Sequence, residues 1–326
     1  MIFQETDTDD NNDFRLHLNK LFDGRINLEP WAIITNDDKL LFGESSCYGP
    51  YPEEHWVFRT IKLPKPIHLT GKTLFISSRT NYWHLIANEL CNLVALELSD
   101  IDLNHFDHII FEKYTDKAAN ELHKIFSLQQ HKQISISKNK HFICDELNFF
   151  SSSALLSKTL IYAVSQKILS SFNKVESNPS ISYPGRIVIS RVSSSTRRWI
   201  NEEECMQLLS SEGFQSVVLE NMNLIDQVNI FRSADIILGP HGAGFTNLIF
   251  ASPTTKIVEI RSEKQGGPYS SATCFEELSK IIGLEHHVFK CPSISRRNLR
   301  GRSIEDADLI PDSQELLSYL SNHLLK

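Results

Sequence analysis

One stretch, Ala234 to Ile260, constrains the fold of this chain more than any other. It opens with the apolar run Ile236 to Leu238, breaks at GPHGAG (239–244), and continues as the amphipathic segment Phe245 to Phe250. A second apolar run, Lys256 to Ile260, follows. This order predicts the strand–helix–strand unit of a nucleotide-binding sheet. Glycines let backbone N–H groups approach a ligand closely, and a helix start favours an anion.

The rest of the second half alternates between the two kinds of element. The patterns predict strands at 186–190, 216–219 and 286–289, and helices at 201–212, 224–233, 273–282 and 313–325. Strands separated by helices of about ten residues are typical of a parallel, doubly wound α/β sheet.

The first half is predicted to be a separate α/β domain. Strands are expected in WAIIT (31–35), KLLFG (39–43) and WVFRTIKL (56–63), and at 73–77 and 108–111; helices are expected at 82–98, 120–126 and 157–172. Residues 1–13 are rich in Asp, Asn and Thr, which predicts disorder. The domains are then 14–178 and 179–326, and the terminal helix of the second can pack back on either.

Composition narrows the class of protein. The net charge of −7 over 326 residues argues against nucleic acid as the main partner. Six cysteines without paired spacing are typical of reduced thiols in a cytosolic protein. The polar N-terminus does not read as a secretory signal, and no apolar run is long enough to span a membrane. We therefore expect a soluble, cytoplasmic chain.

Three arginines, Arg191, Arg197 and Arg198, follow the strand expected at 186–190. The carboxyl edge of an open parallel sheet is where ligands bind, and guanidinium groups there suit a pyrophosphate. The alternative is a solvated basic loop. His241 lies in the glycine-rich turn beside Thr246 and Asn247. A lone histidine is more often structural, but its place in this loop favours a function.

Several familiar patterns are missing or incomplete. The turn lacks the dinucleotide pattern G-x-G-x-x-G and a Walker lysine, which disfavours NAD and ATP. Asp100-Ile101-Asp102 resembles a metal motif only by a short match, and His286-His287-Cys291 lacks a second ligand pair, so no metal is expected. The basic cluster at 296–302 is a solvated loop, an acceptor-phosphate contact or a peripheral membrane contact.

The first half offers two candidates for a catalytic base. Asn81-Tyr82-Trp83-His84 stands at a loop-to-helix junction, and Glu89 follows five residues after His84. Residues five apart do not share a face of an α-helix closely, so the spacing selects neither. The alternative for His84 is a purely structural hydrogen-bonding role.

Together these segments resemble glycosyltransferase family 61, whose bacterial members are often labelled capsular polysaccharide biosynthesis proteins. The resemblance rests mainly on residues 186–260, in the segments RIVISR (186–191), RRWINEEE (197–204), GF-x4-LE (213–220), Gln227-x3-Phe231, ADIILGPHGAGFTNLIF (234–250) and VEI (258–260). NYWHLIANEL (81–90) and SQELLSYL (313–320) are similar to further segments of the family. The family usually has an acidic residue four positions after the first-half histidine, where this chain has Asn88.

The resemblance implies a GT-B-like fold, with two Rossmann-like domains facing across a cleft. It also implies an inverting reaction without an essential metal or other cofactor, and a nucleotide-sugar held mainly by the C-terminal domain. The implied catalytic residues are His84, Glu89 and His241. The implied donor-binding residues are Arg191, Arg197, Arg198, Asn201, Gly239, His241, Gly242, Ala243, Gly244, Thr246, Asn247 and Glu259.

Our sequence-based hypothesis is transfer of a sugar to a surface polysaccharide or a lipid-linked saccharide, in the cytoplasm or at the inner face of the membrane. Two rivals stay open. One is a non-catalytic nucleotide- or saccharide-binding partner of a polysaccharide assembly complex, and the other is a Rossmann-type oxidoreductase. The pattern leaves the oligomeric state undefined.

Overall fold

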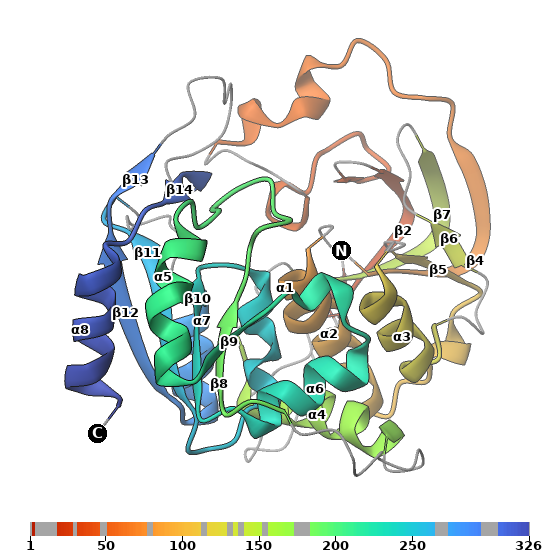
Figure 1. Cartoon of the computed structure of the whole chain (residues 1–326). Helices are drawn as coiled ribbons and strands as arrows, with labels where there is room; N and C mark the ends of the chain where they lie inside the picture. The colour runs from red at the N-terminus through yellow and green to blue at the C-terminus, as the bar shows by residue number, and fades with distance from the viewer. Residues whose placement is uncertain are drawn as a thin grey trace. The chain divides into compact units, whose positions relative to one another are not determined.

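The computed structural model describes residues 2–3, 18–28, 31–45, 51–76, 81–111, 116–128, 133–135, 140–151, 156–172, 183–264, 273–294 and 306–325. The chain divides into two compact units, Met1–Ile168 and Leu169–Lys326 (Figure 1). The basic cluster at 296–302 lies outside the described residues, as does the stretch 1–13 that was predicted to be disordered, apart from residues 2–3.

The N-terminal unit is built on a mixed sheet. Its order is β1-β2-β7-β4-β5-β6, and β3 pairs with the end of β2, on the edge away from β7. The strands β4 to β7 pair in parallel, whereas β2 is antiparallel to β1, β3 and β7. Their bounds are β1 Ile2–Phe3, β2 Leu18–Asn27, β3 Ala32–Ile34, β4 Ile67–Phe75, β5 His108–Phe111, β6 Gln133–Ser135 and β7 His141–Phe150.

The helices of this unit begin at side-chain caps. Asn81 accepts a hydrogen bond from the backbone N–H of Trp83, where α1 (Tyr82–His84) begins. A π-helical segment (Leu85–Leu90) and α2 (Cys91–Leu98) follow α1 without a break, so that the three form one continuous helix. Asp116 caps α3 (Lys117–Ile125) in the same way, and α4 (Lys158–Phe172) follows β7. Asn and Asp are favoured there because they bond the unpaired N–H groups of a first turn.

Two strand predictions in this unit are wrong. Residues 39–43 and 56–63 form short 3₁₀ turns at 42–44 and 56–59, not strands. A further 3₁₀ turn, 52–54, begins at Pro52, and the ring of His55 accepts a hydrogen bond from the Val57 N–H. Local capping of this kind competes with strand pairing. Two long strands, β2 and β7, were not predicted.

The C-terminal unit has the predicted parallel sheet. Its order is β12-β11-β10-β8-β9, and every neighbouring pair is parallel. The bounds are β8 Arg186–Ile189, β9 Phe214–Val217, β10 Ile236–Pro240, β11 Lys256–Ser262 and β12 Glu285–Cys291. Counted along the chain, the strand order is 2-1-3-4-5, so the winding reverses between β8 and β10.

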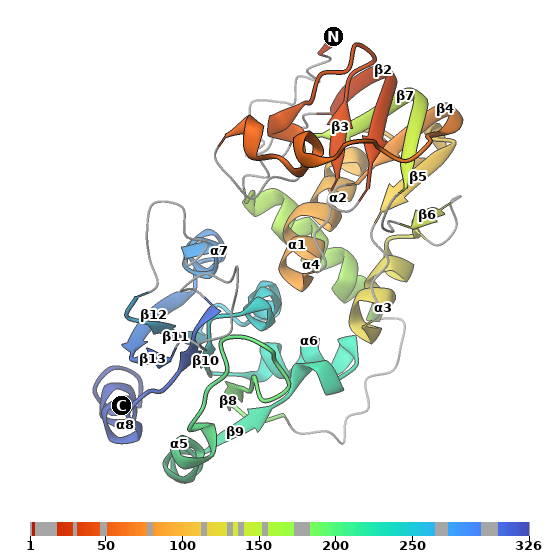
Figure 2. The same cartoon turned by 90° about the horizontal axis from the view of Figure 1, so that it is seen from above.

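Helices cover both faces of this sheet (Figure 2). On one face lie α5 (Glu202–Leu209) and α8 (Ser313–His323), whose apolar residues share a core with Val188, Leu238 and Ile260. On the other lie α6 (Leu224–Ser233), the 3₁₀ helix Ala243–Phe250 and α7 (Cys274–Ile282). The terminal helix therefore packs on the C-terminal unit. A small ribbon, β13 (Ser293–Ile294) with β14 (Asp308–Leu309), precedes it.

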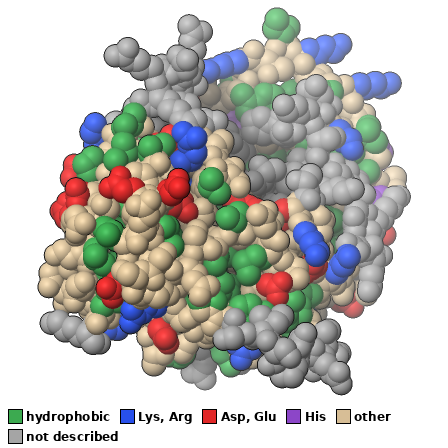
Figure 3. All heavy atoms as spheres, in the orientation of Figure 1, with side chains coloured by type: hydrophobic (Ala, Val, Ile, Leu, Met, Phe, Trp, Pro, Cys, Tyr) green, Lys and Arg blue, Asp and Glu red, His purple; other side chains and the backbone are tan. Residues whose placement is uncertain are grey.

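The start of α5 carries a concentration of negative charge. Glu202, Glu203 and Glu204 occupy its first turn, and Figure 3 shows acidic side chains gathered on the surface there. Carboxylates in a first turn are stabilised by the helix dipole. Within the described ranges, no helix is both long and apolar enough to cross a membrane.

Candidate active site

The reversal of strand order places two chain segments side by side. Arg191 follows β8 and His241 follows β10, and the two strands are direct neighbours with Leu238 opposite Val188. Ligands of open α/β sheets bind outside the carboxyl ends of the strands at such a reversal. The architecture therefore points to the loops after β8 and β10 as the site.

Arg191 is held in this loop by carbonyl oxygens. Its Nε donates to the Arg197 carbonyl at 3.2 Å and its Nη2 to the Thr196 carbonyl at 3.0 Å. Among the described residues it forms no ion pair with a carboxylate. Burial, and after it repulsion from Arg197, lowers the pKa of Arg191 from its ordinary value to about 10. The group is charged at neutral pH, and among the described residues Glu220 and Asp306 attract it without forming an ion pair, so an anion beside it would stabilise it further.

Gly242 leaves the space that Arg191 occupies. A Cβ at Gly242 would lie 2.1 Å from Nη1 of Arg191, so the guanidinium packs directly against the glycine backbone. Gly239 and Gly244 allow the turn to pack closely on Ile189 of β8. A Cβ at Gly239 or Gly244 would lie 3.0 or 3.1 Å from the side chain of Ile189. The glycines thus bring the turn against β8 and against Arg191.

The turn also presents backbone donors. In the described part of the chain, no hydrogen bond uses the backbone N–H groups of Gly242, Ala243 or Gly244. These groups stand at the start of the eight-residue 3₁₀ helix. Unpaired N–H groups beside a buried guanidinium are the combination that binds phosphate oxygens.

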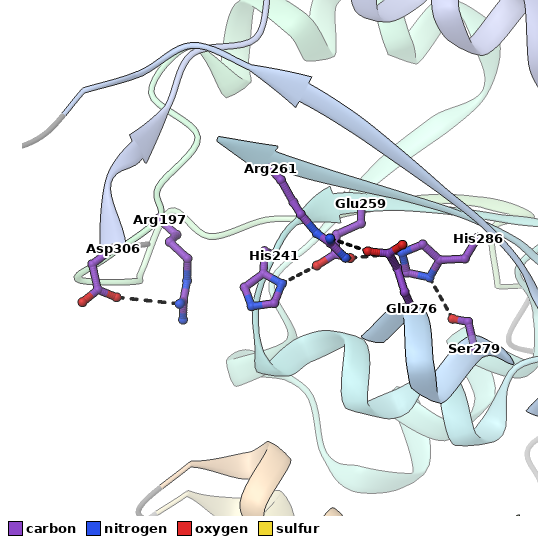
Figure 4. Close-up of polar contacts among 8 residues, drawn as sticks. All are labelled: Arg197, His241, Glu259, Arg261, Glu276, Ser279, His286 and Asp306. Carbon is purple, nitrogen blue, oxygen red and sulfur yellow. Dashed lines mark hydrogen bonds and ion pairs between the residues drawn. The ribbon is translucent and has the colours of Figure 1, made fainter. Parts of the chain in front are cut away.

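His241 points its two ring nitrogens in different directions. Nδ1 bonds to Oε1 of Glu259, while the other nitrogen points away from that carboxylate (Figure 4). The ring is 4% exposed and packs on Phe275 with centroids 5.2 Å apart. Because an ionised carboxylate only accepts hydrogen bonds, Nδ1 carries a proton and Nε2 is the nitrogen offered to a ligand.

Glu259 is fully buried within a polar network (Figure 4). Its Oε2 accepts from Nη2 of Arg261 at 2.5 Å and from Nε2 of His286 at 3.0 Å. Arg261 also pairs with Glu276, and Ser279 Oγ lies 2.8 Å from Nδ1 of His286. Burial alone would raise the pKa of the Glu259 carboxyl, but the hydrogen bonds from His241, His286 and Arg261 hold that pKa well below its ordinary value.

Arg197, Arg198 and Asn201 are tied to the segment that precedes α8. Arg197 lies 3.7 Å from Asp306, and Arg198 donates from its backbone and from Nη2 to the buried Asp308 at 3.0 and 3.2 Å. Asn201 donates to the Pro311 carbonyl at 2.8 Å. These residues fix the shape of the loop that carries Arg191.

Two predicted donor contacts face inward. The side chain of Asn247 is buried and donates to Gln227 at 2.8 Å, and Gln227 in turn donates to the Leu219 carbonyl. Thr246 is also fully buried. These contacts join the 3₁₀ helix to α6. Glu259 likewise lies behind His241, with both of its oxygens occupied.

The N-terminal candidates have separate partners. Nδ1 of the half-buried His84 bonds to Oδ1 of Asn88 at 2.8 Å. Glu89 is fully buried and meets Nε2 of His123, on α3, at 2.7 Å. His84 directly precedes the π-helical segment and Glu89 lies within it, and such segments are frequent at functional sites.

Sequence reasoning missed the residues behind His241. Strand alternation could have found Arg261, because residues 259 and 261 share a face of β11. His286 was weighed only as a zinc ligand with His287 and Cys291. The strand separates these three: His287 contacts Tyr319 on the opposite face, and Cys291 lies in the apolar core. The described residues contain no group of three metal-ligating side chains placed to hold an ion.

The sequence of the chain matches the family model described as "Glycosyltransferase 61" over residues 82–258. The chain belongs to this family. The matched span runs from the α1 segment to β11, so it includes His84, Arg191 and His241 and ends one residue before Glu259.

Curated relatives carry transferase names. The chain is 36% identical to a beta-1,2-xylosyltransferase of Arabidopsis thaliana over 104 residues, which are 28% of this chain and 18% of that protein. It is 23% identical to an EGF domain-specific O-linked N-acetylglucosamine transferase of Mus musculus over 195 residues, which are 58% of this chain and 34% of that protein. The matched stretches thus span about a third or less of these relatives.

Proposed function

We propose that the chain is an inverting glycosyltransferase that takes a sugar from a nucleotide-sugar donor without an essential metal ion. One observation carries the proposal. At the reversal point of the sheet, Arg191 lies without a carboxylate partner among the described residues, against the glycine turn that presents unpaired N–H groups and His241. Family membership and the names of the relatives support sugar transfer as the chemistry.

The leaving diphosphate is the group that this site would stabilise. A hydrogen bond to a charged group contributes about 1.5–3 kcal/mol, whereas a helix terminus contributes about 0.3–1 kcal/mol. Arg191 should therefore outweigh the start of the 3₁₀ helix. His241 adds a donor from Nε2 when its ring is protonated, and Glu259 holds that ring in place.

The reaction needs a base on the acceptor side. The acceptor oxygen forms a bond to the anomeric carbon, the bond from that carbon to the diphosphate breaks, and the acceptor proton passes to the base. We assign this role to the N-terminal unit, in the GT-B arrangement that the resemblance implies. His84 is preferred over Glu89, because Glu89 is fully buried against His123.

The class of acceptor and the cellular compartment are proposed from the family resemblance and the composition. From the resemblance to bacterial members we propose a surface polysaccharide or a lipid-linked saccharide, in the cytoplasm or at the inner face of the membrane. The scattered cysteines favour a reducing compartment. The name of one relative suggests a second class of acceptor, an EGF domain.

A nucleotide-sugar panel tests the proposal. UDP-, GDP-, dTDP- and CMP-sugars would be compared by thermal shift and by donor hydrolysis, with magnesium and with EDTA. We expect one nucleotide class to stabilise the protein in both conditions. Arg191→Ala should abolish the shift, while Arg232→Ala, an exposed arginine on α6, should retain it.

Other outcomes would contradict the proposal in distinct ways. A strict need for magnesium would overturn the metal-free mechanism. Donor binding with neither hydrolysis nor transfer to any saccharide acceptor would support a non-catalytic binding protein. Stabilisation by NAD(P) alone would support an oxidoreductase.

A further inference from the structure

Three hydrogen bonds from three different side chains converge on the Glu259 carboxylate. His241 bonds to Oε1, and Arg261 and His286 bond to Oε2. Glu259 and Arg261 come from β11, His286 from the neighbouring β12, and His241 from the turn after β10. The network therefore links the reversal point of the sheet to its β12 edge.

The two bonds to Oε2 act differently. Arg261 divides its hydrogen bonds between two carboxylates, because its Nη1 also bonds to Glu276 on α7. His286 has its second nitrogen fixed by the fully buried Ser279 hydroxyl, also on α7, at 2.8 Å. The imidazole is thus clamped between α7 and β11. A carboxylate held at one oxygen by two donors cannot turn its other oxygen away from His241 without breaking both bonds.

The charged and titratable groups around this carboxylate come from every element packed there. They are Arg261 from β11, His286 from β12, Glu276 and Cys274 from α7, and His241 from the turn after β10. Phe275 of α7 covers the His241 ring from the apolar side. The second ring nitrogen of His241 points away from the carboxylate, whereas that of His286 meets the Ser279 hydroxyl (Figure 4).

We propose that His286 is a positioning residue for His241. By donating from Nε2 to Glu259, it fixes the carboxylate so that Nδ1 of His241 stays protonated and turned inward and Nε2 faces the donor phosphate. This role rests on the proposed function of His241, but the orientation itself is a property of the protein without a donor. Neither residue 259 nor residue 286 lies within the span matched to the family.

The test follows the protonation of His241 directly. Full-length protein with ¹⁵N-labelled histidine would be studied by long-range ¹H–¹⁵N NMR over a pH series without nucleotide, with the His241 signals assigned from a His241→Gln spectrum. In the wild type, we expect one form of the neutral His241 ring, protonated at Nδ1. His286→Leu should give a mixture of both neutral forms, because the carboxylate is released.

Three further variants complete the test. His286→Gln places an amide N–H near the position of Nε2 and should restore the single form. Ser279→Ala removes one buried hydroxyl and should give an intermediate mixture, even if His286→Leu does not fold. His287→Gln, on the opposite face of β12, should match the wild type. An unchanged His241 signal in both His286→Leu and Ser279→Ala would overturn the proposal.

Kinetics separate this inference from the proposed function. With the nucleotide-sugar that the panel selects, His286→Leu should lower kcat/KM by about ten- to a hundredfold through misplacement of His241, mainly in kcat, and His286→Gln should recover most of it. If no nucleotide-sugar is a donor, the proposed function is wrong. The NMR experiment still tests the positioning role of His286, because it is done without nucleotide.

Discussion

At the scale of single residues, the site depends on what surrounds each charge. Arg191 and Arg198 are both arginines of one loop, yet Arg198 is paired with Asp308 while Arg191 faces Gly242 without a carboxylate among its described contacts. The sequence groups them equally, because side-chain partners more than a hundred residues away leave no local pattern. Arg191 is therefore the residue on which we place donor binding.

Gly242→Ala should weaken donor binding while leaving the fold intact. Its φ of 173° is extended backbone, so alanine is compatible with the conformation, but the added Cβ would lie 2.1 Å from Arg191 Nη1 and displace the guanidinium. We expect a loss of roughly tenfold or more in affinity for the nucleoside diphosphate, measured by titration calorimetry. Gly43→Ala has open space and should bind as the wild type does. Equal affinities of all three proteins would contradict this placement of Arg191.

Glu259→Gln should change the pH dependence of stability. The folded-state pKa of Glu259 lies below its ordinary value of 4.5, so its ionisation contributes stability that is fully present above about pH 5 and is lost as the pH falls further. At pH 7 the variant should lose on the order of 3 kcal/mol of unfolding free energy, and the difference should shrink at pH 4. Urea unfolding at both pH values measures this. A difference that does not depend on pH would refute it, and the exposed Glu277→Gln serves as the control.

At the scale of elements, the sequence predicted the helices and strands whose apolar residues recur at helical spacing or in a short continuous run. In the C-terminal unit, each strand of the parallel sheet coincides with an apolar run and each α-helix with a helical spacing of apolar residues. The strands between Arg186 and Cys291 lie within a few residues of their predicted positions. β2 was missed because its Asp23-Gly24 pair resembles a turn. Residues 56–63 were predicted to be a strand because their β-branched and aromatic residues outweighed local capping around His55.

The loop that carries Arg191 owes its shape to β14. The backbone N–H groups of Arg197, Arg198 and Ile200 bond to residues of the segment 306–309. Asp308→Ala removes the acceptor of the Arg198 amide, so that amide should exchange hydrogen about tenfold or more faster. Hydrogen exchange followed by mass spectrometry over 192–200 measures the change, with β11 peptides as the internal reference. Protection that stays at the wild-type level would show that β14 does not hold the loop.

At the scale of the whole molecule, the chain consists of two units with separate cores. The N-terminal core gathers around Ile26, Phe75 and Phe142, and the C-terminal core around Val188, Leu238 and Ile260. All groups proposed to hold the donor lie in the C-terminal unit, whereas the candidate bases lie in the N-terminal unit. Binding of the nucleotide should therefore stabilise one unit selectively.

Calorimetry should resolve this selectivity. We expect two unfolding transitions, of which the nucleoside diphosphate at a hundred times its Kd raises only one, by about 5 °C or more. Arg191→Ala should remove the shift. A single transition that moves as a whole would contradict selective stabilisation of the unit that binds the donor.

A crystal structure with the nucleoside diphosphate bound would test donor binding by Arg191 most directly. We predict that the diphosphate lies at the carboxyl ends of β8 and β10, within hydrogen-bonding distance of Arg191 Nη1, the N–H groups of residues 242–244 and His241 Nε2. A diphosphate held elsewhere, on the N-terminal unit or away from Arg191, would contradict it.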